Sequence, residues 1–120
     1  MSVAVHIPLW RAAHGRTGDK GNRSNISVIA WSEALYPFIE AQITALRVAE
    51  QFRHRAPTRV VRHVLPNLHA LNFVLDDVLD GGVNDALNLD SHGKALSFHL
   101  LELTLEVPAD LVSHLRGPSD

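Results

Sequence analysis

Charged residues, glycines and short polar side chains crowd into one stretch near the N-terminus, residues 14–25. It lies between the apolar runs Val3–Ala13 and Ile26–Trp31 and contains no apolar residue itself. The sequence predicts a long loop here, and compact domains rarely keep such a loop unless it has a function. Glycines permit positive φ and let backbone N–H groups turn inward, and this stretch has three: Gly15, Gly18 and Gly21. Basic residues outnumber acidic ones, so the stretch suits an anion.

Within this stretch, Asp19 is a candidate catalytic residue, and Lys20 offers three donors to a carboxylate or phosphate. The spacing fits neither a P-loop nor a dinucleotide fingerprint, because a strand follows in place of a helix. An ordinary hairpin loop, with a solvated Asp19–Lys20 pair and Asx turns, is the alternative. The candidate ligand-binding residues of the stretch are Gly18, Lys20, Gly21, Asn22, Ser24 and Asn25.

A second polar cluster, residues 90–94, lies where a helix is expected to begin. His92 is a candidate acid or base, and Lys94 is a candidate anion ligand. If loops from both parts of the chain reach one edge of a sheet, residues 14–25 and 90–94 form one site; the alternative is a helix cap with exposed side chains.

A third polar group consists of Asn67, His69 and Asn72. His69 and Asn72 lie three apart, on one face of a predicted helix, but we favour a helix cap at Asn67 over a ligand site.

The sequence contains few residues arranged to bind a metal or a cofactor. The chain has no cysteine, which excludes disulfides, thiolate catalysis and Cys-ligated metal sites. No zinc-protease spacing of histidines occurs, so a site would have to draw on His14, Asp19, His69 or His92 from across the fold. We expect neither a metal nor a cofactor.

Hydrophobic periodicity predicts the elements that position these residues. Pro8 restricts the first strand to a sheet edge, and Ser32 caps a helix that Pro37 divides, with a second part starting near Thr44. Residues 71–75 also read as a strand. The predicted order is strand 3–12, strand 26–31, helix 32–54, strand 58–65, helix 68–79, strand 83–89, helix 90–100 and strand 101–107.

This order predicts an α+β fold. From residue 26 onward, and without helix 68–79, it is βαββαβ, the ferredoxin-like antiparallel sheet with helices on one face. Helix 68–79 is then an insertion, and strand 3–12 adds to the same sheet. We expect a single domain over residues 1–120, with its core at about 3–107 and a tail at 108–120.

Charge and hydropathy limit the kinds of partner that we expect this protein to bind. Residues 1–63 hold nine Lys/Arg against four Asp/Glu, and residues 64–120 hold two against nine, so the halves carry +5 and −7. Such polarity can steer an anion or help copies dock, and we expect a homo-oligomer. Aromatic residues are 6% of the chain, which disfavours nucleic acid. No signal peptide or membrane span is predicted, so we expect a cytoplasmic protein.

Several motifs in order resemble the small ferredoxin-fold domain of the AtuA-like proteins of acyclic terpene utilisation. The resemblance covers roughly residues 10–107. Ser27 and Asp80 depart from it, since each stands where the family has glycine. The matching motifs are Gly18-Asp19-Lys20-Gly21, Asn25-Ile26, Leu65-Pro66-Asn67-Leu68, Leu71-Asn72-Phe73-Val74-Leu75, Gly81-Gly82-Val83 and Asp90-Ser91-His92-Gly93-Lys94.

The resemblance implies a small accessory or binding subunit in the catabolism of acyclic or branched carboxylic acids as CoA thioesters. In that family the domain often follows a larger region, so we expect a separately encoded AtuA-like large subunit as partner. Two other functions stay open. One is a self-sufficient hydratase or lyase acting on a carboxylate or acyl-CoA, with His92 as acid or base and Lys20 holding the anion. The other is a structural oligomerisation module.

Overall fold

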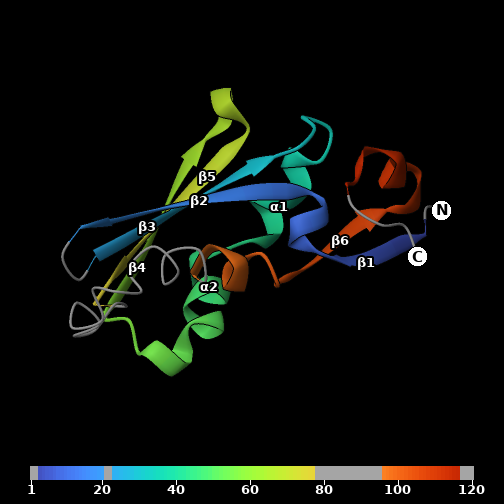
Figure 1. Cartoon of the computed structure of the whole chain (residues 1–120). Coiled ribbons are helices and arrows are strands. Elements are labelled where there is room, and N and C mark those ends of the chain that lie inside the picture. Colours follow the sequence, from blue (N-terminus) through green and yellow to red (C-terminus); the bar gives the residue numbers. More distant parts are fainter. Residues whose placement is uncertain (1–2, 21–22, 78–95, 117–120) are drawn as a thin grey trace.

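The computed structural model describes residues 3–20, 23–77 and 96–116. Six strands and several short helices follow one another along the described chain (Figure 1), and residues 96–100 are also helical. The elements are β1 (Ala4–Pro8), η1 (Leu9–Arg11), β2 (Ala13–Lys20), β3 (Arg23–Ala30), α1 (Tyr36–Gln42), α2 (Ala45–Gln51), η2 (Arg53–Arg55), β4 (Arg59–Leu65), η3 (Pro66–Leu68), β5 (Ala70–Asp76), β6 (Thr104–Pro108) and η5 (Ala109–His114).

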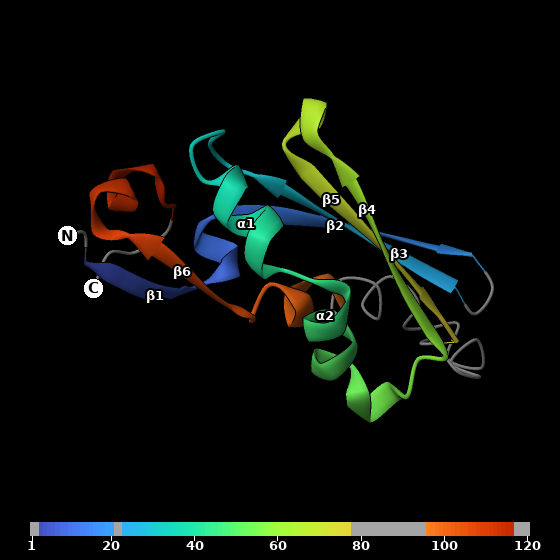
Figure 2. The same cartoon turned by 180° about the vertical axis from the view of Figure 1, so that it is seen from behind.

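Two antiparallel sheets organise the molecule. The larger sheet has four strands in the order β2-β3-β5-β4, and the smaller one pairs β1 with β6. Helices α1, α2 and 96–100 lie on one face of the larger sheet, and the β1–β6 ribbon extends from one end together with η5 (Figures 1 and 2). The chain is therefore elongated, with extents of 51 × 26 × 25 Å.

The core forms where this sheet meets the helices. Alternate residues of β3 and β5 are buried, because a strand turns successive side chains to opposite faces. Tyr36 of α1 is buried too, and its hydroxyl donates to the Ala70 carbonyl at 3.3 Å. Burial raises the pKa of Tyr36, with Glu40 adding to the shift and Arg62 opposing it. The fully buried large side chains include Leu9, Ile26, Leu35, Ile39, Ile43, Phe52, Leu71, Phe73, Leu75, Leu96, Leu100 and Leu105.

The predicted α+β, ferredoxin-like class is confirmed. From β3 onward the described elements follow the order βαββαβ, with helices on one face of the four-stranded antiparallel sheet, although the last strand of this order, β6, lies in the smaller sheet. The first strand was expected to join this sheet, but β1 pairs with β6 instead, from Ala4 opposite Pro108 to Pro8 opposite Thr104. Pro8 lacks an N–H at a position that faces away from β6, so it does not interrupt the pairing, and the Leu9 N–H still donates to the Leu103 carbonyl at 2.7 Å. Strand 58–65 is confirmed as β4. Strand 101–107 is confirmed from Thr104, because a turn occupies residues 101–102. Residues 83–89 lie outside the described part of the chain.

The predicted helix over residues 68–79 is wrong. Residues 70–76 form β5, and the competing strand at 71–75 is confirmed. β5 is paired on both sides, with β3 and with β4, so its backbone groups are satisfied across the sheet. Its apolar residues fit a helical stripe and an alternating strand equally well, and neighbouring strands decided between them.

The predicted loop at residues 14–25 is also wrong. Ala13–Lys20 and Arg23–Ala30 are paired strands of one hairpin, so most of the polar stretch is β structure. Neither Gly15 nor Gly18 has a positive φ. Their role is close packing, since a Cβ on Gly15 would lie 3.3 Å from Leu101 Cδ1 and 3.5 Å from Ser97 Cβ.

The helical region breaks between α1 and α2, near the predicted Thr44. Thr44 caps α2, its hydroxyl accepting from the Arg47 N–H at 3.2 Å. Pro37 stands in the first turn of α1, where a proline costs no hydrogen bond, so it does not itself break the helix. Ser32 caps the turn before α1, its hydroxyl accepting from the Ala34 N–H. No helix in the described residues is long and apolar enough to cross a membrane.

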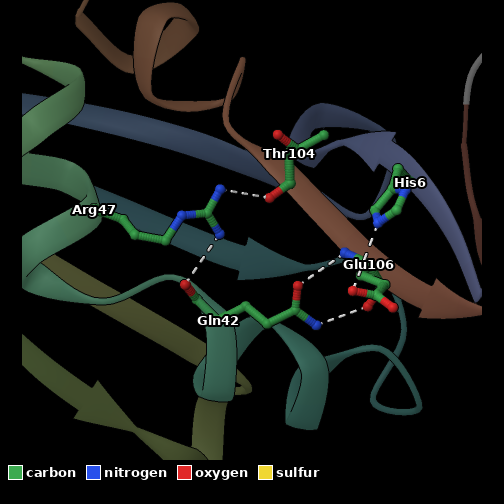
Figure 3. A network of polar contacts seen from close by, with 5 residues as sticks. All are labelled: His6, Gln42, Arg47, Thr104 and Glu106. Carbon is green, nitrogen blue, oxygen red and sulfur yellow. Dashed lines mark hydrogen bonds and ion pairs between the residues drawn. The ribbon is translucent and has the colours of Figure 1, made fainter.

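Side chains from α1 and α2 cap the outer edge of β6 (Figure 3). Gln42 donates to the Glu106 carbonyl at 2.7 Å and accepts from the Glu106 N–H at 2.8 Å. Arg47 donates to the Thr104 carbonyl at 2.9 Å and to the Gln42 carbonyl at 3.1 Å. These bonds occupy the groups through which β6 would otherwise accept another strand.

Replacing Gln42 by glutamate should lower the free energy of unfolding by about 1–3 kcal/mol. The change keeps the shape of the side chain but turns its donor into an oxygen that faces the Glu106 carbonyl. Urea denaturation of Gln42→Glu beside Glu50→Gln, a charge change at an exposed site of α2, measures the difference. Equal stability of the two variants would mean that this cap contributes nothing.

Candidate functional site

One face of the four-stranded sheet is left uncovered by the described helices, and it carries most of the polar residues of the sheet. Strand register and alternation assign its side chains. The strand positions on this open face are His14, Arg16 and Gly18 of β2, Arg23, Asn25, Ser27 and Ile29 of β3, Ala70, Asn72, Val74 and Asp76 of β5, and Arg59, Val61, His63 and Leu65 of β4.

A polar row crosses the middle of the open face. The register places Arg16 opposite Ser27, Ser27 opposite Asn72, and Asn72 opposite His63. Asn72 donates to Ser27 Oγ at 2.9 Å and to Asn25 Oδ1 at 3.5 Å. The central amides and hydroxyl are therefore held by one another, while Arg16 and His63 stand at the two ends.

Gly18 makes room for Asn25. A Cβ on Gly18 would lie 3.2 Å from the Asn25 side-chain nitrogen, so the amide lies directly over the glycine. This packing explains why glycine stands at a strand position, where it otherwise weakens the strand.

The hairpin end of the open face holds a pair of opposite charges and a hollow. Arg23 Nε donates to Asp76 Oδ1 at 2.6 Å, and this hydrogen bond, with the negative charge of Asp76, raises the pKa of Arg23. Beside the pair is an open hollow of about 190 Å³. Its lining residues are Arg23, Arg59, Val61, His63, Val74 and Asp76.

Two arginine side chains on this face have no partner within the described ranges. The side chains of Arg16 and Arg59 are exposed and make no hydrogen bond, ion pair or ring contact there. Asp76 is the one acidic residue among the open-face positions given above, and Arg23 already pairs with it. Among the described residues, the face consequently carries positive charge that no carboxylate compensates.

The opposite end of the open face is apolar. Ile29, Ala70 and Leu65 form the row next to Arg16, and Leu65 is 38% exposed. His14 stands opposite Ile29 at the β2 end of this row, and its ring lies 4.5 Å from that of Trp31, whose ring centre is 4.9 Å from the Arg116 guanidinium. Along its strands the face thus changes from cationic to apolar.

The covered face of the hairpin carries different groups. Ser24 is fully buried there, opposite Leu75, and so it does not share a surface with Gly18 and Asn25. Among the residues described, the buried oxygens Thr17 Oγ1 and Ser24 Oγ have no hydrogen-bond partner. The structure therefore separates Ser24 from Gly18 and Asn25, the other predicted ligand residues whose faces it describes.

Several predicted site residues cannot be placed. Gly21, Asn22, His92 and Lys94 lie outside the described part of the chain, as does the predicted meeting of residues 14–25 with 90–94. Asp19 and Lys20 are strand residues, opposite Ser24 and Arg23, but their side chains lie outside what the structure describes. Both therefore stay predictions.

The third predicted group is divided. Asn72 lies on the open face, whereas His69 follows η3 with φ of 51° and contacts Glu33 and Tyr36 near α1. The shared helical face predicted for His69 and Asn72 does not exist, because Asn72 belongs to β5.

Sequence reasoning did not select Arg59 or His63 for the site. Both stand at alternate positions of the correctly predicted strand 58–65, so alternation alone could have assigned them to one face.

Other parts of the described chain are less suited to bind a ligand or a metal ion. No group of three or more His, Cys, Asp or Glu residues there is arranged to hold a metal ion. A larger hollow of about 260 Å³ lies between α1 and the β1–β6 ribbon, lined by residues such as Val3, Phe38 and Val107. We favour the smaller hollow, because the polar groups of Gln42 and Glu106 in the larger one bond to each other.

Comparison with known proteins assigns the family. The model of the AtuA ferredoxin-like domain matches residues 7–106, which is most of the chain. Searches of curated proteins and of solved structures found no match. The chain belongs to the AtuA ferredoxin-like domain family.

Proposed function

We propose that this protein is a small binding subunit that holds an anionic acyl compound, a CoA thioester of an acyclic or branched carboxylic acid, on the open face of its four-stranded sheet. The observation that carries the proposal is the pair of exposed arginines, Arg16 and Arg59, without a partner among the described residues. Guanidinium groups bind carboxylates and phosphates through two parallel hydrogen bonds. Unpaired arginines on a face with one acidic residue are suited to such a ligand.

The separation of these arginines favours an elongated ligand. Arg16 and Arg59 stand three strands apart and four residues apart along the strands. Their backbone positions are therefore about 20 Å from each other. A small carboxylate reaches one of them, whereas a CoA thioester can place its phosphates at one arginine and its uncharged thioester carbonyl, a hydrogen-bond acceptor, at the other.

The two ends of the open face differ in charge, and this difference predicts how the ligand is oriented on it. Arg59 and the Arg23–Asp76 pair surround the hollow at the hairpin end, which suits phosphates. Arg16 lies next to the apolar row Ile29, Ala70 and Leu65, which suits a branched hydrocarbon chain. Gly18 and Asn25 stand between these two ends, and the predicted ligand Lys20 is opposite Arg23 at the hairpin end.

The family gives the proposed context. The proposed context, acyclic acid catabolism, follows from the resemblance to the AtuA-like proteins of acyclic terpene utilisation, and a separately encoded large subunit is the proposed source of the catalytic groups. In the alternative, a self-sufficient hydratase or lyase, Asp19 and His92 are the proposed catalytic residues. Lys94, Gly21 and Asn22 remain proposed ligand residues, whereas Ser24 is buried on the covered face and does not belong to this site.

Isothermal titration with CoA, a branched acyl-CoA, the free branched acid and inorganic phosphate tests the proposal. Arg59→Gln should weaken CoA and acyl-CoA binding about tenfold, because one charge-assisted contact is lost. Arg16→Gln should weaken acyl-CoA and the free acid more than CoA. Raising the salt concentration should weaken every anion, since exposed charges are screened.

Arg53→Gln is the matched control, because it removes the same charge from an exposed residue of η2. It should bind like the wild type. Binding that all three variants reduce equally would reflect net charge alone and would contradict a site on the open face, as would failure of every ligand to bind the wild type.

A further inference from the structure

The β1–β6 ribbon has two edges, and only one of them is capped by the described residues. Gln42 and Arg47 occupy the outer edge of β6 (Figure 3). Beyond the free edge of β1 no coloured element runs alongside in either view (Figures 1 and 2). The two edges of the ribbon are therefore not equivalent.

The register identifies the groups on the free edge. Glu106 directs its N–H and carbonyl to Gln42, away from β1, so the pair His6–Glu106 exchanges no backbone hydrogen bonds. In an antiparallel pair such positions alternate with bonded ones, so His6 and Ala4 direct their backbone groups outward. Within the described residues these outward groups have no partner.

The composition of β1 leaves this edge open to another strand. Edge strands usually carry charged residues that prevent pairing, and β2 and β4 do so with Arg16, Arg59 and Arg62. β1, with the sequence Ala-Val-His-Ile-Pro, has no Lys, Arg, Asp or Glu. Its single proline stands at the end of the strand.

We propose that a second copy of this chain pairs with β1, antiparallel across a two-fold axis at His6, to give a sheet in the order β6–β1–β1–β6. The two His6 residues then exchange both backbone hydrogen bonds, and each Ala4 N–H donates to the Pro8 carbonyl of the other copy. Pro8, which lacks an N–H, stands opposite Ala4 and blocks no other pair. This register satisfies every outward N–H of the strand.

Self-pairing also covers exposed apolar residues. In this register Val3, which is 70% exposed, lies at the end of the paired strands, near the start of η1 of the second copy, where Trp10 is 41% exposed. Because β1 has no fixed charge, two copies do not repel each other, and a charged partner strand would find no complementary residue. A second copy therefore fits this edge better than a charged segment of another protein.

This inference does not depend on the proposed function. The β1–β6 ribbon lies apart from the open face (Figures 1 and 2), so the dimer leaves both open faces accessible. Ligand binding and dimerisation can consequently fail separately.

Sedimentation velocity of the full chain over the micromolar range tests the dimer. The wild type should sediment with twice the monomer mass, and His6→Pro should sediment as a monomer. The substitution removes an N–H that faces only outward, and an edge strand tolerates proline at such a position. The monomer should therefore still fold and unfold in a single thermal transition. The expected loss of affinity is at least about tenfold.

Two further variants keep the test decisive. His6→Lys places two like charges at the two-fold axis without changing the backbone, and it too should yield a monomer, even if His6→Pro fails to fold. His6→Gln keeps the outward N–H and should remain a dimer. A monomeric wild type would overturn the proposal, as would a dimer that His6→Lys leaves intact.

Discussion

Replacing Phe73 by alanine should lower the free energy of unfolding by about 3–5 kcal/mol. Phe73 is fully buried in the middle of β5, where it faces the helices between β3 and β4. Truncation leaves a cavity at the centre of the sheet, and the two flanking strands hold the backbone in place, so the site cannot collapse. Denaturation in guanidinium chloride measures the loss.

Val74→Ala is the matched control, because Val74 is the next residue and lies half-exposed on the open face. It should cost less than about 1 kcal/mol. A helix over residues 68–79 would reverse this order, since its apolar stripe contains Val74 and leaves Phe73 outside. A larger effect at Val74 than at Phe73 would therefore contradict the strand.

Gly15→Val should destabilise the protein by about 1–3 kcal/mol. A Cβ at this position already lies 3.3 Å from Leu101 Cδ1 and 3.4 Å from the Ser27 carbonyl oxygen, and valine adds two methyl groups. The helix at residues 96–100 must move away from the sheet to accept them. Thermal and chemical denaturation would report the change.

Gly18→Val is its counterpart on the other face of the same strand. Its Cβ would meet only the exposed Asn25 amide, which can swing aside. Since valine favours strands, stability should stay equal or rise, while the position of Asn25 changes and acyl-CoA binding weakens. A loss of stability at Gly18 as large as that at Gly15 would contradict the assignment of the two faces.

The hairpin and β5 show why sequence reasoning succeeded only in part. Residues 14–25 are rich in glycine and charge, the composition of a loop, and yet they pair as two long strands. β3 pairs on both sides, with β2 and with β5, and the glycines serve close approach to a helix and to Asn25. Residues 18–20 pair with residues 23–25 of the same stretch, but β5 and the approaching helix lie elsewhere in the chain, so local composition gave the wrong structure there.

The proposed site differs from the predicted one because it, too, depends on contacts between distant parts of the chain. The sequence predicted Gly18, Lys20 and Asn25 as anion ligands. The structure adds Arg59 and His63, which lie about forty residues further along the chain, because β5 pairs with both β3 and β4 and so brings β4 into the same sheet. The register also separates Ser24 from Asn25, because successive strand residues point to opposite faces. Sequence spacing alone could not give this arrangement.

The sequence by itself determined the α+β class, the family, the order of most elements and the positive charge of the N-terminal half, since these depend on periodicity, motif order and composition. The tertiary structure alone decided that β1 pairs with β6, that residues 70–76 are a strand, and which side chains share the open face. The physical reason is that strand pairing is non-local. A β-strand satisfies its backbone groups only on a neighbour, and the neighbour sets both the register and the face that each side chain occupies.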